Sequence, residues 1–166
     1  DRYYQTAKYF NLDVIIRSNG DCPFIDPVQI DKIIDIWKLN YPKYDYISNI
    51  LEESFPLGMH IEIFSIIALE RALKESKIEE DLEHVTPFIY RNPEKFNLLN
   101  VKNKEDLSMY RWTIDYPEDL EFVKEVYKRF GTDNSLFEMS DIVDLLQNEP
   151  ELLKINSKYK KKQNLL

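Results

Sequence analysis

The chain has 166 residues, of which 43% are hydrophobic and 31% are charged, and this composition argues against a disordered or fibrous protein. A formal net charge of −8 makes nucleic acid and acidic membrane surfaces poor candidates for the main partner, because like charges repel. The single cysteine, Cys22, excludes a disulfide framework or a cysteine metal cluster within one chain, so a reducing, cytoplasmic setting is expected.

A chain of this size is expected to form a single domain with a core of ordinary size. No apolar stretch reaches the ~20 residues needed to span a bilayer, and the charged and aromatic start does not fit a signal peptide. Because the chain opens at Asp1, without methionine and inside a predicted helix over residues 1–10, we expect that an amino-terminal segment is missing. Residues 153–166 are expected to form a polar tail.

The first half of the chain alternates between predicted helices and strands. After the first helix come a strand over residues 12–17, a helix over residues 28–39 and a strand over residues 44–48. The β-branched run from Val14 to Ile16 suits a parallel strand buried on both faces, and Asp26 before Pro27 predicts the N-cap of the helix. This order indicates βαβ units and a largely parallel sheet.

The second half mixes strands and helices in a less regular way. Alternation over residues 59–64 predicts a strand with one core face and one polar face. Ser65 is expected to cap a helix over residues 66–74, and a second helix over residues 79–90 is expected to be interrupted near Pro87. The remaining predicted elements are a strand over residues 96–101, a strand over residues 110–114, a helix ending at Gly131 and a last helix over residues 141–147 capped by Ser140.

Two aspartates follow predicted strands and are the leading candidates for chemistry. Asp21 lies in the loop after the first strand, and because Asp26 already caps the next helix, no capping role is left for Asp21. Asp115 follows the predicted strand over residues 110–114. Since ligands bind at the carboxyl ends of parallel strands, we expect the two carboxylates to converge. We expect them to bind a magnesium ion, which in turn binds the substrate phosphates. Asp115 also has capping-box spacing with Glu118, so a purely structural role stays open for it.

Other residues offer weaker signals. Arg17 and Arg111 lie on or beside the same two strands and are candidates to bind a phosphate or a sugar carboxylate, with a salt bridge to a neighbouring acid as the alternative. His60 and His84 are the only histidines, and they lack the spacing of a zinc site. Cys22 is expected to be a small buried residue rather than a nucleophile, because an adjacent carboxylate raises the pKa of its thiol.

Taken together, these motifs are similar to those of one enzyme family. Residues 17–27, with Gly20-Asp21-Cys22-Pro23 followed by Ile25-Asp26-Pro27, resemble the central motif of cytidylyltransferases of the spore coat polysaccharide biosynthesis type, relatives of the CMP-Kdo and CMP-sialate synthetases. The likeness continues in the family's order through Ser48-Asn49, residues 56–64, residues 83–90 with 93–96, and residues 111–115 with 117–119. The combination is specific, although each motif alone is weak.

The resemblance implies a three-layer α/β/α fold with a mainly parallel sheet, the nucleotide-diphospho-sugar transferase (GT-A-like) fold, with residues 1–152 as the C-terminal two thirds of one cytidylyltransferase domain. It implies transfer of CMP from CTP to a sugar acid with release of pyrophosphate, dependence on Mg²⁺, and a homodimer. The family's metal-binding aspartates fall on Asp21 and Asp115. In this interpretation Asp21, Asp115 and Arg17 are catalytic, and the substrate-binding residues are Asn49, His60, Glu62, His84 and Arg111.

The sequence departs from the family in two places. Nothing in it matches the family's first loop, which carries arginine, serine and lysine and holds the nucleotide, so the chain alone is expected to be incomplete. His60 stands where the family often has an acid, which leaves the acceptor open, whereas Glu62 keeps its place. The alternatives are another nucleotide-sugar transferase or glycosyltransferase of the same fold, or a non-catalytic sugar-binding fragment.

Overall fold

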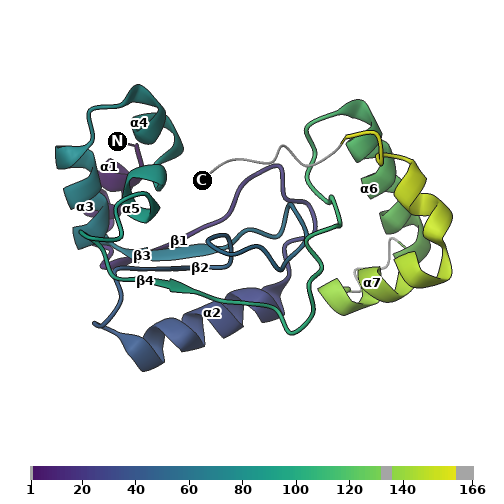
Figure 1. Ribbon diagram of the computed structural model, residues 1–166, viewed down its shortest axis with the longest axis horizontal. Coiled ribbons are helices and arrows are strands. Elements are labelled where there is room, and N and C mark those ends of the chain that lie inside the picture. Colours follow the sequence, from purple (N-terminus) through teal and green to yellow (C-terminus); the bar gives the residue numbers. More distant parts are fainter. Residues whose placement is uncertain (1, 132–135, 160–166) are drawn as a thin grey trace.

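The computed structural model describes residues 2–131 and 136–159, apart from the side chains of residues 80, 82 and 83. Helices and strands mix along the chain (Figure 1). The elements are α1 (Arg2–Tyr9), β1 (Val14–Arg17), α2 (Pro27–Asn40), β2 (Tyr46–Ser48), β3 (Glu62–Ser65), α3 (Ile66–Glu75), α4 (Glu79–His84), α5 (Pro87–Tyr90), β4 (Leu98–Asn100), α6 (Pro117–Phe130), α7 (Met139–Asn148) and the 3₁₀ helix η1 (Pro150–Lys154).

The sheet has the strand order β1-β3-β2-β4. β3 is antiparallel to both neighbours, with Glu62 opposite Arg17 on β1 and Ser48 on β2, whereas β2 and β4 are parallel. β1, β2 and β4 therefore run in one direction and β3 runs against them. The prediction that β1 is a parallel strand buried on both faces was wrong, because β1 lies at the edge of the sheet and Ile16 is 44% exposed.

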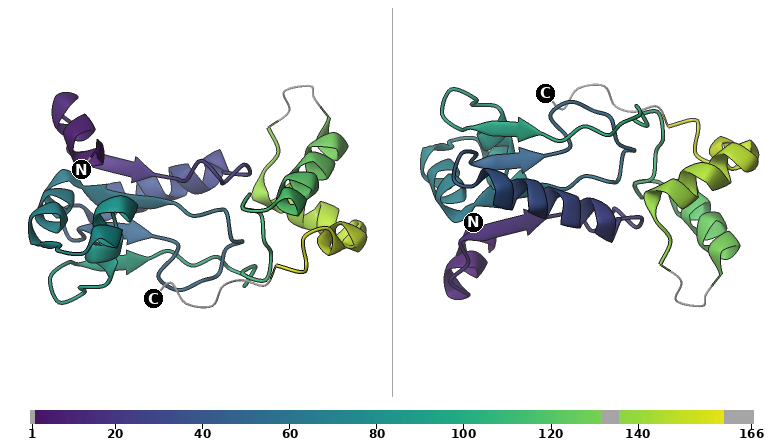
Figure 2. Two further views of the ribbon diagram at one scale, coloured as in Figure 1. Left: turned by 90° about the horizontal axis from the view of Figure 1, so that it is seen from above. Right: turned by 90° about the horizontal axis from the view of Figure 1, so that it is seen from below.

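Helices cover both faces of the sheet, which confirms the three predicted layers (Figure 2). On one face α2 packs Ile33 and Trp37 against Ile47 and Ile63. On the other face α3 and α5 pack around Tyr46 and Phe64; the buried residues of this cluster are Ala7, Ile15, Tyr46, Phe64, Ala68, Leu69, Ala72, Val85, Ile89 and Phe96. Burial of these apolar side chains is what holds the layers together.

A third apolar cluster lies beyond one end of the sheet, where α6, α7 and η1 pack together and form what we call the helical lobe (Figures 1 and 2). Five buried loop residues insert into it, namely Phe24, Phe55, Met59, Leu107 and Trp112. The lobe therefore holds the loops that leave the sheet.

Local capping signals were confirmed at two helices. The Val28 N–H donates to Oδ1 of Asp26 at 2.8 Å, and the Ala68 N–H donates to Oγ of Ser65 at 3.0 Å. Asp26 has a second role, because its Oδ2 accepts the N–H of Met139 at 3.0 Å. The cap of α2 thus also anchors the start of α7.

Two predictions about the second half were wrong, and the structure excludes one role that the sequence left open. Residues 110–114 form no strand but only an isolated bridge between Leu57 and Arg111. Ser140 does not cap the last helix, which begins one residue earlier at Met139. Asp115 does not cap α6, since the N-cap is Tyr116, whose N–H donates to Asp119 Oδ2 at 3.1 Å.

The first residues of the expected polar tail are packed against the rest of the protein. Leu153 and Ile155 pack against the core of the helical lobe, and Asn156 is 5% exposed. The part of the predicted tail beyond Tyr159 lies outside the described residues. Among the helices that the structure describes, none is long and apolar enough to cross a membrane.

Candidate functional site

Three loops meet between the sheet and the helical lobe: residues 18–24 after β1, residues 55–60 before β3, and residues 110–115 before α6 (Figure 1). The carbonyl oxygen of Asp21 accepts the Ile114 N–H at 3.0 Å and the Thr113 hydroxyl at 3.3 Å. Leu57 joins the other pair of loops, because its N–H donates to Tyr110 at 3.0 Å and its carbonyl accepts the Trp112 N–H at 2.7 Å. We call this meeting point the loop junction.

Gly58 makes the close packing of the loop junction possible. Its φ is +103°, and a Cβ at this position would lie 2.6 Å from the Thr113 nitrogen and 2.7 Å from the Trp112 carbonyl carbon. Only glycine adopts this backbone conformation without strain and also leaves the space that the neighbouring backbone fills.

Asp21 and Asp115 are brought to the loop junction by this backbone pairing, since Asp115 directly follows Ile114. Oδ1 of Asp21 accepts the Cys22 thiol at 3.5 Å, and Oδ2 of Asp115 accepts Nη2 of Arg111 at 2.6 Å. In the described part of the chain, no hydrogen bond ends on Oδ2 of Asp21 or on Oδ1 of Asp115. Each carboxylate therefore keeps one oxygen for a ligand.

These donors fit magnesium better than a metal that needs a complete protein cage. Among the described side chains, which leave out those of residues 80, 82 and 83, no group of three or more His, Cys, Asp or Glu is arranged to hold a metal ion. Magnesium binds through one or two carboxylates and fills its remaining positions with water and substrate phosphates. The two carboxylates at the loop junction could serve as such a pair.

Cys22 and His60 lie side by side at the loop junction. Burial raises the pKa of the Cys22 thiol to about 12, with Asp21 adding to the shift, so the thiol is a poor nucleophile as predicted. The backbone of His60 acts on the same thiol and offsets part of this rise in pKa. His60, which is half-buried, is thereby placed next to the Asp21 loop.

Arg111 is held by two carboxylates. It binds Asp119 in bidentate fashion, with Nε at 2.9 Å from Oδ1 and Nη2 at 2.7 Å from Oδ2, and it also binds Asp115. The hydrogen bonds that Arg111 donates to Asp119 are the main reason that the pKa of Arg111 is raised. Asp119, which is 0% exposed, was missed as a site residue; its position in the first turn of α6 was the available signal.

Arg17 and Glu62 form a buried pair opposite each other on β1 and β3. Glu62 is 3% exposed, and its Oε2 accepts the Tyr46 hydroxyl at 2.7 Å. Burial alone would lower the pKa of Arg17, but the ion pair with Glu62 outweighs it and raises that pKa. The carboxylate of Glu62 is thus used within the protein.

Asn49 and His84, two of the expected substrate-binding residues, lie in different surroundings. Asn49 is 2% exposed, and its side chain donates to the Met59 carbonyl at 2.7 Å and accepts the Ile61 N–H at 2.9 Å, so it holds the backbone on both sides of His60. His84 is exposed on α4, at the opposite end of the sheet from the loop after β1 (Figure 1). The structure therefore does not bring His84 together with the loop junction.

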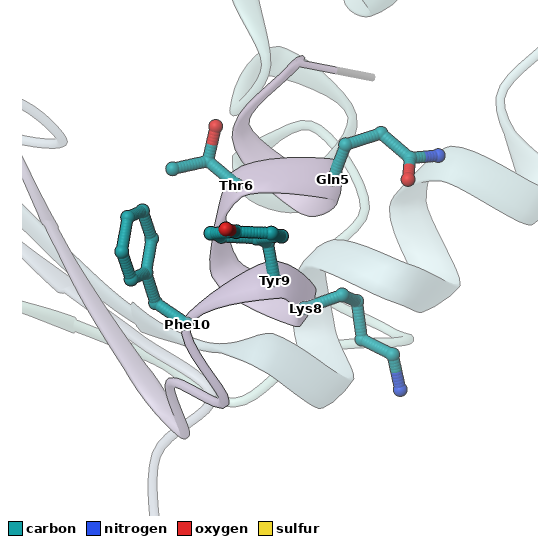
Figure 3. Close-up of a pocket in the computed structure, with 5 residues that line it drawn as sticks. All are labelled: Gln5, Thr6, Lys8, Tyr9 and Phe10. Atoms are coloured by element: carbon teal, nitrogen blue, oxygen red, sulfur yellow. The ribbon is translucent and has the colours of Figure 1, made fainter.

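A separate surface hollow lies on α1, lined by Gln5, Thr6, Lys8, Tyr9 and Phe10 (Figure 3). Tyr9 and Phe10 pack edge to face with ring centroids 4.9 Å apart, and both are exposed. None of the predicted site residues lines this hollow, so the loop junction is the better candidate for a functional site.

Comparisons with known proteins show what the whole chain is similar to. A family model described as Cytidylyltransferase matches residues 1–156. The chain is 35% identical over 164 residues to an uncharacterized protein of Methanocaldococcus jannaschii, covering 98% of this chain and 65% of that protein. It is 30% identical over 154 residues to the spore coat polysaccharide biosynthesis protein SpsF of Bacillus subtilis, covering 91% of this chain and 62% of SpsF.

Among solved structures, that of a cytidylyltransferase from Leptospira borgpetersenii serovar Hardjo-bovis matches with a TM-score of 0.87 and 31% identity. The match covers 99% of this chain and 66% of the other chain. This chain thus spans slightly less than two thirds of the length of each of these relatives, at 65%, 62% and 66%.

Proposed function

Because this chain belongs to the cytidylyltransferase family, we propose that the complete protein transfers CMP from CTP to a sugar acid and releases pyrophosphate in a magnesium-dependent reaction. The observation that carries the proposal is the hydrogen bonding of the Asp21 carbonyl to Thr113 and Ile114, which supports a shared site for Asp21 and Asp115. The sugar acid and the magnesium dependence follow from the family resemblance of these residues.

In this proposal Asp21 and Asp115 would hold magnesium, and each carboxylate has one oxygen that accepts no hydrogen bond from the described residues. The ion supplies positive charge that stabilises the triphosphate and the leaving pyrophosphate. Arg111 keeps Asp115 in one orientation through its bond to Oδ2. The chain's own contribution is mainly positioning and charge stabilisation, as expected for transfer of a phosphoryl-type group.

The acceptor side is proposed to include His60, which lies beside the Asp21 loop. Asn49 fixes the backbone around His60, and the pair of Arg17 with Glu62 secures the β1 and β3 ends that lead into the same loops. We therefore propose that Asn49, Arg17 and Glu62 hold the backbone of the site in place and do not contact the sugar.

One relative is named for spore coat polysaccharide biosynthesis, and we propose a corresponding role here in making an activated sugar for a surface polysaccharide. A homodimer is also proposed, on the family resemblance alone. Analytical ultracentrifugation of the complete gene product tests it, and a single sedimenting species of monomer mass contradicts it.

The proposed activity is tested with the complete gene product, CTP, Mg²⁺ and a panel of sugar acids. Pyrophosphate release is measured together with mass spectrometry of the product, and a CMP-sugar is expected. Transfer of a sugar from a nucleotide sugar without pyrophosphate release would favour a glycosyltransferase instead. Tight sugar binding without any effect of CTP or Mg²⁺ would favour a non-catalytic binding protein.

The metal assignment is tested by Asp21→Asn and Asp115→Asn. Both variants are expected to stay folded and to lose at least 100-fold in turnover, on the order of the effects seen when a group that stabilises transition-state charge is removed. Asp144→Asn, an exposed aspartate on α7, is the matched control and should keep full turnover. Normal turnover in either of the first two variants contradicts the assignment.

A further inference from the structure

The segment after η1 closes a buried network around Arg111. Asn156 is 5% exposed. Its Nδ2 donates to Oδ1 of Asp119 at 2.9 Å and to the carbonyl oxygen of Arg111 at 3.1 Å. One side-chain amide therefore links the end of the described chain to the first turn of α6 and to the loop junction.

Asp119 fixes the position of Asp115 in two ways. Its Oδ2 accepts the backbone N–H of Asp115 at 3.1 Å, which fixes the main chain at that residue. Its two oxygens also hold Nε and Nη2 of Arg111, and Nη2 in turn donates to Asp115 Oδ2 at 2.6 Å. Because guanidinium is planar, fixing two of its nitrogens on Asp119 fixes the direction in which it reaches Asp115.

The same segment makes a second contact with the network. The ring of Tyr159 stacks on Tyr116 with centroids 3.8 Å apart and planes 1° apart. The guanidinium carbon of Arg111 lies 5.4 Å from the Tyr116 centroid and 5.9 Å from the Tyr159 centroid, within the range of a cation–π contact. Arg111 is thus ordered by this segment from two sides.

We propose that Asn156 is a positioning residue, which acts through Asp119 and Arg111 to hold the carboxylate of Asp115 in the orientation that binds magnesium. This inference rests on the proposed function, since it takes Asp115 as a metal ligand. It gives the segment after η1 a part in the reaction although Asn156 touches neither substrate nor metal. Groups that orient a metal ligand in this way commonly change metal affinity by about 10- to 100-fold when they are removed.

The test compares Asn156→Ala with Leu152→Ala in the complete gene product. Leu152 is 3% exposed and belongs to the core of the helical lobe, so its truncation loosens the same region without removing a bond to Asp119. Asn156→Ala is expected to raise the Mg²⁺ concentration for half-maximal pyrophosphate release about tenfold, with the KM for CTP at saturating Mg²⁺ unchanged. Leu152→Ala is expected to lower Tm and to leave the Mg²⁺ requirement within about twofold. An equal shift in both variants, or no shift in Asn156→Ala, overturns the proposal.

A second readout needs no activity. The backbone N–H groups of Asp115 and Tyr116 both donate to Asp119, so their hydrogen exchange reports on the order of the network. Asn156→Ala should accelerate exchange at these two amides more than Leu152→Ala does. If the wild-type protein forms no CMP-sugar, the proposed function fails, and exchange still decides the positioning role: unchanged exchange in Asn156→Ala overturns it.

Discussion

The carbonyl oxygen of Asp21 accepts the N–H of Ile114 at 3.0 Å. This bond joins the loop after β1 to the loop before α6, and it is strengthened by the Thr113 hydroxyl at 3.3 Å from the same oxygen. The contact places the two candidate metal ligands in neighbouring stretches of backbone. It does so without a strand at residues 110–114.

Thr113→Val tests how much the hydroxyl adds to this junction. The substitution removes one hydrogen bond and keeps the side-chain shape, and the Ile114 N–H still satisfies the Asp21 carbonyl, so a loss of about 1 kcal/mol in unfolding free energy is expected. Urea denaturation measures it, with Thr6→Val on the exposed face of α1 as the control. A loss above about 3 kcal/mol would mean that the junction depends on the hydroxyl rather than on the backbone pair.

Gly58→Ala is expected to destabilise the protein by at least about 2 kcal/mol, because the new Cβ meets the Trp112 and Thr113 backbone at a positive φ. Gly20→Ala is the matched control, since apart from the adjoining residues of the chain no atom lies within 4 Å of its added Cβ. Thermal and urea unfolding of both variants measures the difference. Equal stability of the two variants would contradict this and would show that the backbone of Trp112 and Thr113 moves away at little cost in free energy.

Glu62→Ala leaves Arg17 as a charge without its partner, in a site where the Arg17 side chain is 16% exposed and the Glu62 side chain 3% exposed. Breaking such a pair from one side costs about 3 kcal/mol or more, because the remaining ion stays desolvated. Glu75→Ala removes an exposed carboxylate that pairs with Arg71 and Lys95 and should cost less than about 1 kcal/mol. Denaturation curves with similar midpoints for both variants would contradict this.

The Asp119 carboxyl should make stability depend on pH in the acid range. Burial alone would raise its pKa, but hydrogen bonds from Arg111, Asn156 and two backbone N–H groups outweigh burial and lower the pKa below its ordinary value. Its contribution is therefore fully present above the unfolded-state pKa of about 4 and is lost as the pH falls through the lower folded-state pKa.

Asp119→Asn should accordingly be much less stable than the wild type at pH 7, and the gap should narrow as the pH falls below about 4. Urea denaturation at a series of pH values measures the gap. Asp144→Asn, at an exposed position, should show no such narrowing. A gap that stays constant down to pH 3 would rule out a lowered pKa at Asp119.

Cys22 should react with iodoacetamide far more slowly in the folded protein than in urea. With a thiol pKa of about 12 in the folded state, the thiolate fraction at pH 8 is on the order of a thousandfold smaller than for an unfolded cysteine. Since Cys22 is the single cysteine of the chain, intact mass spectrometry follows the reaction without ambiguity. Folded and unfolded rates within about tenfold of each other would contradict the shift.

The sequence located the segments of the site but not the contacts that assemble them. Asp21 was identified because Asp26 already capped α2, and the structure confirms that cap. Asp115 was identified as the end of a strand that does not form. The prediction reached the right part of the chain from a wrong element, because residues 110–114 pack as an extended loop that hydrogen-bonds to Leu57 and to the Asp21 carbonyl.

What the sequence alone determined is local: Asp26 and Ser65 set helix starts and Gly131 a helix end, because caps and breakers act on residues only a few positions away. Only the tertiary structure decided that β1 lies at the sheet edge and that Asp119, Arg111 and Asn156 form one network around Asp115. The pairing of β1 with β3 and the bond of Asn156 to Asp119 depend on partners far away in the sequence, and no local pattern encodes which partner a buried polar group will find.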